Sequence, residues 1–231
     1  MSNNKLKNLL LDYFLPSYCF NCKLPTERGK VICDECYSQI EFTPEKSCIK
    51  CGLSDKNCRC KFSVFHFNFM AAPFFNDGVA KKGLYAVKFL NNSILTDFYA
   101  EHMVKCFAER TDERNFSLVT YVPSNLLKIY KRGYNQSYLL AEKVADMMSL
   151  PVKSTLKRRI FSHTQHKRSK MDERFENAYM SYKSINKVSG RVLLIDDIQT
   201  TGASLDACAR ELLKAGADEV YCLTALVGIK N

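Results

Sequence analysis

The amino-acid sequence predicts an α/β domain, with a mostly parallel sheet flanked by helices, that follows a small zinc-binding module. Eight of the eleven cysteines lie between residues 19 and 60 and come in close pairs. After them, apolar segments of strand length alternate with segments of helical periodicity, which is the element order of a parallel α/β sheet. One of these strands runs directly into two acids and a hydroxyl-rich turn. The 231 residues have room for one medium domain and a small appendage.

Residues 1–15 are expected to form an N-terminal helix, with its helical part at 5–15. The apolar run of this segment is broken at Asp12 and lacks the small-residue cleavage site of a signal peptide. No apolar run in the sequence approaches the ~18–20 residues that a membrane-spanning helix needs. We therefore expect no membrane span and a cytoplasmic location.

Residues 16–62 are expected to form the zinc module. A C-x-x-C turn lets two thiolates converge on one metal, and two such pairs complete a tetrahedral, all-thiolate site. Eight cysteines therefore suit two structural zinc ions, with no coordination position left for catalysis. The predicted ligands are Cys19, Cys22, Cys33, Cys36, Cys48, Cys51, Cys58 and Cys60.

A disulfide framework is the alternative for these cysteines, since it is common in small secreted domains. The lack of an export signal and the close pairing favour zinc. We expect the pairs to share a metal locally, the first with the second and the third with the fourth. A crossed arrangement of the pairs would give the same spacing.

The α/β domain is expected to occupy residues 63–231. Alternation of Phe65, Phe67, Phe69 and Ala71 with other residues predicts a strand pair that extends through Phe75. The elements that follow are expected in this order: helices at 79–90 and 96–110, a strand at 118–122, a helix at 136–148, a shorter strand near 152–156, a strand at 192–195, a helix from 204 to about 216 and a last strand at 219–227.

The strand at 192–195 is the one that carries chemistry. Its four residues are all apolar, as in a strand buried on both faces of a parallel sheet. Leu205, Cys208 and Leu212 then recur at helical spacing, and the helix is expected to end near Gly216. The residues between strand and helix are thus expected at the carboxyl edge of the sheet, where open α/β folds place their ligands.

The turn itself combines acids with hydroxyls. Asp196 and Asp197 suit vicinal sugar hydroxyls, which donate hydrogen bonds to ionised carboxylates. The following residues offer backbone N–H groups and hydroxyls at a helix N-terminus, a cradle for phosphate; they are Thr200, Thr201, Gly202, Ala203 and Ser204. An ordinary turn with two solvent-facing acids is the simpler alternative. The combination fits a sugar that carries a 5′-phosphate.

The segment Val192–Ser204 resembles the phosphoribosyl pyrophosphate motif of type I phosphoribosyltransferases. Ser204 stands where many members have threonine, which keeps the hydroxyl. The resemblance implies that Asp196 and Asp197 hold the ribose hydroxyls and that Thr200–Ser204 hold the 5′-phosphate. It also implies Mg²⁺, bridging the pyrophosphate and the ribose.

Other segments narrow the resemblance. Lys131-Arg132-Gly133-Tyr134-Asn135-Gln136, then Gln165-x-x-x-Ser169 and Arg174-x-x-Asn177, together with the N-terminal cysteine pairs, resemble the ComF family. Its members are bacterial proteins associated with DNA uptake during natural transformation. The resemblance implies a role in competence, with single-stranded DNA, a helicase-like uptake protein and DNA-processing proteins as partners. Arg132 is the first candidate to stabilise the leaving pyrophosphate, ahead of Lys128, Arg158 and Arg174.

The charge distribution leaves two functions open. The net charge is +10, and residues 126–174 hold twelve Lys or Arg against four acids. In one hypothesis the protein is an enzyme that transfers phosphoribosyl to an unidentified acceptor. In the other it is an adaptor that holds single-stranded DNA on basic and aromatic residues such as Tyr130 and Tyr134, and its phosphoribosyl site is a ligand sensor or a relic. A solvated basic face is the simplest interpretation of the charge alone.

Overall fold

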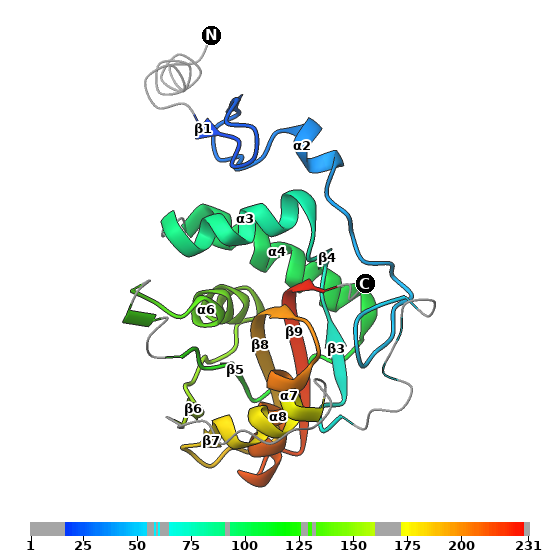
Figure 1. Ribbon diagram of the computed structural model, residues 1–231, viewed down its shortest axis with the longest axis vertical. Coiled ribbons are helices and arrows are strands. Elements are labelled where there is room, and N and C mark those ends of the chain that lie inside the picture. The colour runs from blue at the N-terminus through cyan, green and yellow to red at the C-terminus, as the bar shows by residue number, and fades with distance from the viewer. Residues whose placement is uncertain are drawn as a thin grey trace.

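The computed structural model describes residues 17–54, 58, 60, 65–90, 93–125, 129–130, 133–159 and 172–228, with the backbone alone at 88–90, 93 and 172–174. Figure 1 shows a cysteine-rich N-terminal part followed by an α/β domain. The helices and strands are β1 (Ser17–Tyr18), β2 (Pro25–Thr26), α2 (Asp34–Ser38), β3 (Phe69–Ala71), β4 (Phe74–Phe75), α3 (Gly78–Leu90), α4 (Ser93–Arg110), β5 (Leu118–Tyr121), α6 (Gln136–Met148), β6 (Leu156–Arg158), α7 (Asp172–Ser181), β7 (Tyr182–Ser184), β8 (Arg191–Gln199), α8 (Ala203–Lys214) and β9 (Glu219–Val227).

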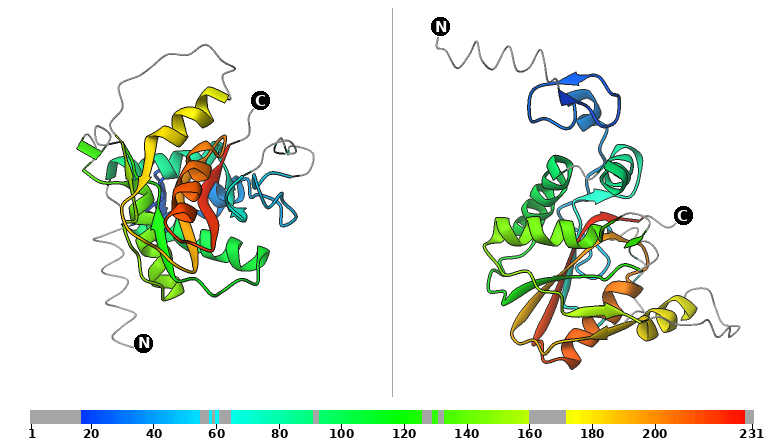
Figure 2. Two further views of the ribbon diagram at one scale, coloured as in Figure 1. Left: turned by 90° about the horizontal axis from the view of Figure 1, so that it is seen from below. Right: turned by 90° about the vertical axis from the view of Figure 1, so that its left-hand side faces the viewer.

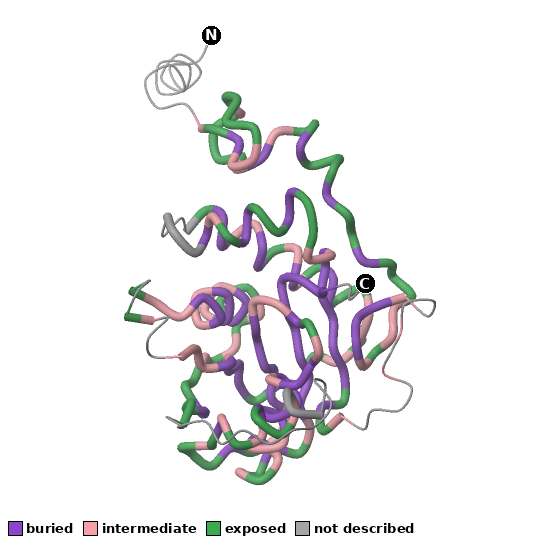
Figure 3. The backbone as a smooth tube through the Cα atoms, in the orientation of Figure 1, coloured by how far each residue is buried: buried purple, intermediate pink, exposed green. Residues whose placement is uncertain are grey.

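The central sheet has the strand order β3-β9-β8-β5, with β4 also paired to β9. All of these pairings are parallel. β8 and β9 are the long central strands, and most of their residues are buried (Figure 3). Their apolar sequences are thus explained by burial on both faces of a parallel sheet, as the sequence predicted.

Helices cover both faces of this sheet (Figure 2). On one face, side chains of α3, α4 and α6 pack against Leu193 and Ile195 of β8. On the opposite face, Leu205, Cys208 and Leu212 of α8 pack against the alternate residues of β8 and β9. The helical spacing that predicted α8 therefore corresponds to its buried stripe.

Several predicted elements agree closely with the structure. The helix at 136–148 and the strand at 219–227 have the expected bounds, and α3, α4 and β5 begin and end within a few residues of theirs. The strand pair expected through Phe75 is different: β3 and β4 each pair with β9 and not with one another. Near 152–156 there is a single bridge from Val152 to Val119, and the strand β6 lies further on, paired antiparallel with β7. Helix α7 and strand β7 were not predicted.

The cysteine-rich part rests on the α/β domain in two places. Cys19, Ile32 and Cys36 share a buried cluster with residues of α3 and α4. Cys51 and Leu53 belong to the cluster on the other face of the sheet, next to Phe67 and Met70. The backbone N–H of Met70 donates to Ile49 O at 2.8 Å, so the second half of the cysteine-rich part pairs with the edge strand β3.

Candidate functional site

The predicted motif lies at the carboxyl edge of the central sheet. β8 continues past the apolar run through both acids to Gln199, which is in register with Val227 of β9. α8 begins directly after the turn, and α6 begins beyond the end of the neighbouring strand β5. The acids, the hydroxyl-rich turn and two helix N-termini therefore meet at one edge, where the sequence predicted a ligand site.

Asp196 is the buried member of the acid pair, with 8% of its surface exposed. Its Oδ1 accepts hydrogen bonds from Ser137 Oγ at 2.8 Å and from the backbone N–H of Asp197 at 2.9 Å. Burial and the negative charge of Asp197 raise the pKa of Asp196 well above its usual value in spite of these bonds. Asp197 is half-buried and is the more accessible of the two acids.

The residues that follow Arg132 hold the edge together. Asn135 caps α6: its Oδ1 accepts from Ser137 N at 3.2 Å and from Ser124 Oγ at 2.8 Å. Its Nδ2 donates to Val122 O at 3.2 Å, which ties the cap to the end of β5. Gln136 Nε2 donates to Leu84 O of α3 at 2.9 Å. This family-like stretch therefore positions α6, and through Ser137 it positions Asp196.

The hydroxyl-rich turn requires glycine at its centre. Gly202 has φ of 81°, and a Cβ there would lie 3.1 Å from the ring of Phe65. The turn places Gly202 at the N-cap of α8, whose first-turn N–H groups lack helical acceptors. These N–H groups and the positive end of the helix dipole suit an anion such as phosphate.

A second wall faces this turn. A cavity of about 640 Å³ lies between the turn residues Thr200, Thr201, Ala203 and Ser204 and residues from β6, α7 and β7. The residues on the facing wall are Arg158, Asn177, Ala178, Ser181 and Tyr182.

Tyr182 links the two walls of this cavity. Burial raises the pKa of Tyr182 to about 12, so its hydroxyl stays protonated and donates to Ser204 Oγ at 3.3 Å. The guanidinium of Arg158 lies over the Tyr182 ring, 5.6 Å from its centroid, and supplies positive charge to the cavity. Sequence reasoning ranked Arg158 low and missed Tyr182, although Asn177 lies in the Arg-x-x-Asn segment that it singled out.

Some predicted residues lie outside the described part of the chain. These are Arg132 and Lys128, the segment from Gln165 to Ser169 and the N-terminal helix at 5–15; the side chain of Arg174 is likewise not described. Of the two aromatic residues suggested for stacking on nucleic acid, Tyr130 is 90% exposed. Tyr134, in contrast, is part-buried, and its hydroxyl donates to Val87 O, which ties this side chain to α3.

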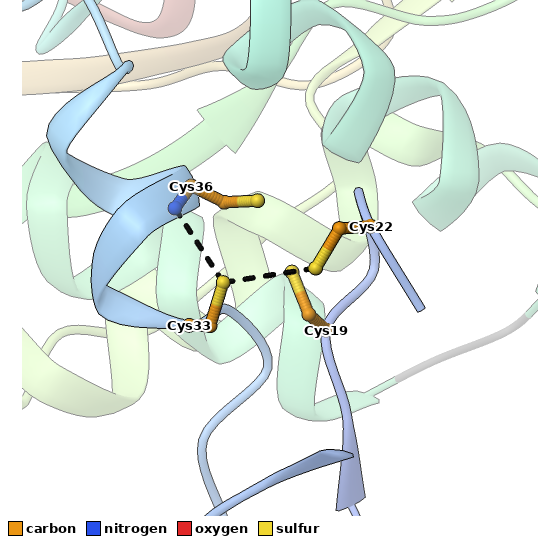
Figure 4. Close-up of side chains that lie close together, drawn as sticks. All are labelled: Cys19, Cys22, Cys33 and Cys36. Carbon is orange, nitrogen blue, oxygen red and sulfur yellow. Dashed lines mark hydrogen bonds between the residues drawn. The ribbon is translucent and has the colours of Figure 1, made fainter. Parts of the chain in front are cut away.

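The eight paired cysteines form two separate groups of four, and within each group the sulfurs lie within 4.8 Å of one another. The first group is Cys19, Cys22, Cys33 and Cys36, and its side chains converge in Figure 4. The second is Cys48, Cys51, Cys58 and Cys60. The local pairing expected from the sequence is confirmed.

The geometry of both groups fits zinc. The sulfur separations include 3.7 Å for Cys22–Cys33 and 3.3 Å for Cys48–Cys60. A tetrahedron with Zn–S bonds of about 2.3 Å has edges of about 3.8 Å, whereas a disulfide needs about 2.05 Å. None of the eight is joined in a disulfide, so the disulfide alternative is not supported.

The electrostatics of the second group also call for a cation. Desolvation opposes ionisation of Cys48, but hydrogen bonds from the backbone N–H groups of Lys50 and Cys51 and from two neighbouring thiols together outweigh it and lower the pKa of Cys48 to about 7. Desolvation and the charge of Cys48 then raise the pKa of Cys51 to about 11. Negative charges on neighbouring thiolates repel one another, and a bound metal ion offsets that repulsion. Bound zinc would hold the knuckle together and leave no open coordination position.

Fold and site together define the class of protein: a parallel α/β domain with an acid pair and a helix N-terminus at the carboxyl edge of its sheet, joined to a cysteine-rich module with two four-thiol groups. Residues 10–61 match the double zinc ribbon domain family. No helix in the described part of the chain is long and apolar enough to cross a bilayer.

Within this class, the chain resembles ComF-type competence proteins, as its motifs indicated. Competence protein ComFC of Bacillus subtilis is 24% identical over 196 residues, which are 80% of this chain and 79% of that protein. Competence protein F of Haemophilus influenzae is 32% identical over 103 residues, 43% of this chain and 45% of that protein. The chain thus spans under half the length of the second relative.

Two solved structures show a weaker similarity. The allosteric regulatory enzyme of purine biosynthesis is 18% identical with a TM-score of 0.37, over 56% of this chain and 26% of that one. A purine phosphoribosyltransferase from Pyrococcus horikoshii is 13% identical with a TM-score of 0.35, over 56% of this chain and 86% of that one.

Proposed function

We propose that this protein binds phosphoribosyl pyrophosphate together with Mg²⁺ at the edge formed by β8 and α8, and that it acts in DNA uptake during natural transformation. The observation that carries the proposal is the juxtaposition of an acid pair with a phosphate-type helix N-terminus. Asp196 and Asp197 follow the buried apolar run of β8, and the turn to Ser204 opens α8 across a cavity from Arg158. The role in DNA uptake is supported by the similarity to two competence proteins.

The two halves of the ligand would use different chemistry. The 5′-phosphate would accept hydrogen bonds from the N–H groups at the start of α8 and from the hydroxyls of Thr200, Thr201 and Ser204. Arg158 would add a charge-assisted contact from the facing wall. The ribose hydroxyls would donate to the acid pair, with the more accessible Asp197 as the main acceptor. Mg²⁺, when bound, would neutralise the pyrophosphate oxygens.

We further propose that the bound ligand can transfer its phosphoribosyl group. A nucleophile would attack the anomeric carbon, the bond to the pyrophosphate oxygen would break, and the pyrophosphate would leave with the bonding electrons. The protein would contribute positioning and charge stabilisation, with Arg132 as the candidate cation. The acceptor is unidentified. Release of pyrophosphate with candidate acceptors, and its loss in Arg132→Met, would test this step.

Binding of single-stranded DNA is the second candidate function, and a specific surface supports it. The ribbon of β6 and β7 and the residues that flank it carry exposed cations: Lys153, Lys157, Arg158, Arg159, Lys183 and Lys187. None of them makes an ion pair with a residue that the structure describes. Such a surface suits a phosphate backbone, and its affinity would fall steeply with salt.

Calorimetric titration with phosphoribosyl pyrophosphate and Mg²⁺ tests the binding proposal. The wild type should bind saturably, and Asp197→Asn should bind at least about tenfold more weakly, because a hydrogen bond to a charged group contributes ~1.5–3 kcal/mol. Ser154→Ala, on the exposed loop before β6, is the matched control and should bind like the wild type. No binding by the wild type would overturn the proposal.

Asp196→Asn should separate binding from stability. Folding raises the pKa of this carboxyl, so the folded state binds more protons than the unfolded state. The contribution of Asp196 to the free energy of unfolding therefore falls as the pH rises above about 3.9, the pKa of an aspartate in the unfolded chain. At neutral pH this carboxyl is ionised in the unfolded chain, so burying Asp196 lowers the free energy of unfolding. We expect Asp196→Asn to melt about 2–4 °C higher than the wild type at pH 7, the shift of ~1 kcal/mol in a chain of this size, while it binds the ligand more weakly. The gain should vanish near pH 4, as measured by thermal melts.

A further inference from the structure

The turn that opens α8 is covered by residues that directly follow the zinc module in the chain. The ring of Phe65 packs on Gly202, where even a methyl group would come within 3.1 Å of it. Phe65 also lies against Phe175 of α7, with ring centroids 6.1 Å apart. One aromatic side chain thus packs on the centre of the proposed phosphate turn and reaches the helix that forms its facing wall.

The next residue, His66, is hydrogen-bonded to the first turn of α8. Asp206 is fully buried, and its Oδ1 accepts from the backbone N–H of His66 at 2.5 Å. The Nδ1 atom of His66 lies 3.2 Å from both carboxylate oxygens, and Tyr179 of α7 donates to Oδ2 at 2.5 Å. Asp206 N in turn donates to Gly202 O at 2.8 Å. The segment 65–66 is therefore fastened to the helix that begins at the turn.

The other end of the same segment is fastened to the second cysteine group. Lys50 lies between the ligands Cys48 and Cys51, and its Nζ donates to Phe67 O at 2.6 Å. Phe67 is buried, and its ring stacks on that of Phe65 at 4.9 Å. The knuckle is also bonded to β3 through Ile49 O, and Gly52 lies against Met70. A continuous set of contacts thus runs from the second cysteine group through residues 65–67 to Gly202.

We infer that zinc in the second group raises the affinity of the turn for phosphoribosyl pyrophosphate, with Phe65 and His66 as the positioning residues. This inference rests on the proposed function of the turn. Zinc would fix the turn formed by residues 48–51, and Lys50 of this turn is hydrogen-bonded to Phe67. Phe65 and His66, which precede Phe67, would then keep the first turn of α8 in its binding conformation. Because coupling between two ligands is reciprocal in their equilibrium affinities, the phosphoribosyl ligand must also raise the affinity of the second group for zinc. We expect this tighter binding to appear as slower loss of the ion.

The first cysteine group provides the internal control. It packs on α3 and α4, where the rings of Phe20 and Phe98 lie 6.5 Å apart. In the described part of the chain, no contact that we find joins it to residues 200–206. Zinc in the first group should therefore leave the affinity of the turn unchanged.

The experiment compares two double variants by calorimetry with phosphoribosyl pyrophosphate and Mg²⁺, after each is shown to hold one zinc and to keep its α/β secondary structure. Cys58→Ser/Cys60→Ser should bind about tenfold more weakly than the wild type, within the usual range of coupling between sites. Cys22→Ser/Cys33→Ser should bind within about twofold of the wild type. Equal affinity in the two variants would overturn the inference.

Phe65→Ala keeps every cysteine and tests the contact directly. It should retain two zinc ions and bind the ligand about fivefold more weakly, within the usual coupling range, whereas Phe65→Leu should restore most of the affinity. Unchanged affinity in Phe65→Ala would contradict the positioning role, whether or not the cysteine variants fold.

Zinc release supplies a readout that is independent of turnover. Transfer of zinc from the wild type to a chromogenic chelator should show one phase that saturating phosphoribosyl pyrophosphate slows several-fold and one that it leaves unchanged. Equal slowing of both phases would indicate general stabilisation and would reject the coupling. If the wild type does not bind the ligand at all, the proposed function fails first; binding without selective protection removes the coupling alone.

Discussion

The two cysteine groups have the same chemistry but different attachments to the α/β domain. The first lies against α3 and α4 through aromatic side chains, with Tyr37 near Phe98 and its hydroxyl 3.1 Å from His102 Nε2. The second is joined to the edge strand β3 by backbone and lysine hydrogen bonds, through Ile49 and Lys50. Four thiolates determine that a metal binds. The contacts that each cysteine group makes with the α/β domain determine which part of that domain a bound metal stabilises.

The second attachment also protects a sheet edge. β3 is an outer strand of the central sheet, and an unpaired outer strand exposes backbone groups that can pair with other chains. Ile49 O accepts the N–H of Met70 and so covers part of this edge. The second group is therefore expected to stabilise the sheet, whereas the first stabilises mainly its own knuckle and the surface of two helices.

Loss of one buried thiolate from each group should have the largest effect. Cys36→Ser and Cys51→Ser, both at buried positions, should each lose one zinc and lower the free energy of unfolding by several kcal/mol, since structural zinc contributes ~10–16 kcal/mol in small peptides. Cys51→Ser should speed hydrogen exchange of the Met70 amide more than Cys36→Ser does, because it also releases the Ile49 carbonyl that accepts this N–H. Similar exchange at Met70 in both variants would show that the two attachments are equivalent.

Two glycines, one in each cysteine-rich half, allow the attachments of the two groups to be compared through a smaller change in stability. Gly29 and Gly52 have φ of 84° and 71°, so alanine is strained at both. A Cβ at Gly29 meets nothing within 4 Å, whereas one at Gly52 would lie 2.8 Å from Met70 Sδ. Gly29→Ala should cost ~1–2 kcal/mol from the backbone alone. Gly52→Ala should cost about 2–4 kcal/mol, because overpacking is added.

Denaturant unfolding of the two zinc-loaded glycine variants measures both costs. Gly83→Ala is a useful further comparison, since its Cβ would come within 2.5–2.8 Å of Tyr99 and Phe20 at ordinary φ. A larger loss of stability in Gly29→Ala than in Gly52→Ala would place the tighter attachment at the first group and reverse the comparison.

The sequence was informative wherever the determining residues are contiguous. Val192–Ser204 predicted a strand, a turn and a helix, and the structure has them, because burial on both faces and a glycine-centred turn both leave local signals. The pairing of the cysteines was also predicted, since each zinc knuckle is closed by residues near in the chain.

The remainder of the site depends on contacts between distant residues. His66 and Asp206 are 140 residues apart, and Tyr182 and Ser204 come together only because α7 and β7 fold over α8. Helix α7 has a polar sequence and few apolar repeats, so its buried Ala178 gave no periodic signal. The stretch from Lys131 to Gln136 was singled out for its resemblance and for the cation Arg132, and no sequence signal indicated that Asn135 caps α6 or that Gln136 anchors it to α3.

Two lysines give the most delicate test of the comparison between the groups. Each donates to a backbone carbonyl: Lys23 to Phe20 O at 2.9 Å within the first knuckle, and Lys50 to Phe67 O at 2.6 Å across to the α/β domain. Methionine keeps the apolar stem of each side chain and removes the donor. Lys50→Met should cost ~1 kcal/mol, because a part-buried carbonyl loses its partner, while Lys23→Met at an exposed bond should stay within about 0.5 kcal/mol of the wild type. In thermal melts, the melting temperature should fall by about 2–4 °C in Lys50→Met and stay unchanged in Lys23→Met. If Lys23→Met is the more destabilised, the attachment through Lys50 contributes little, and the second group must be fixed to the sheet by its remaining contacts, those of Ile49 and Gly52 and the buried Cys51 and Leu53.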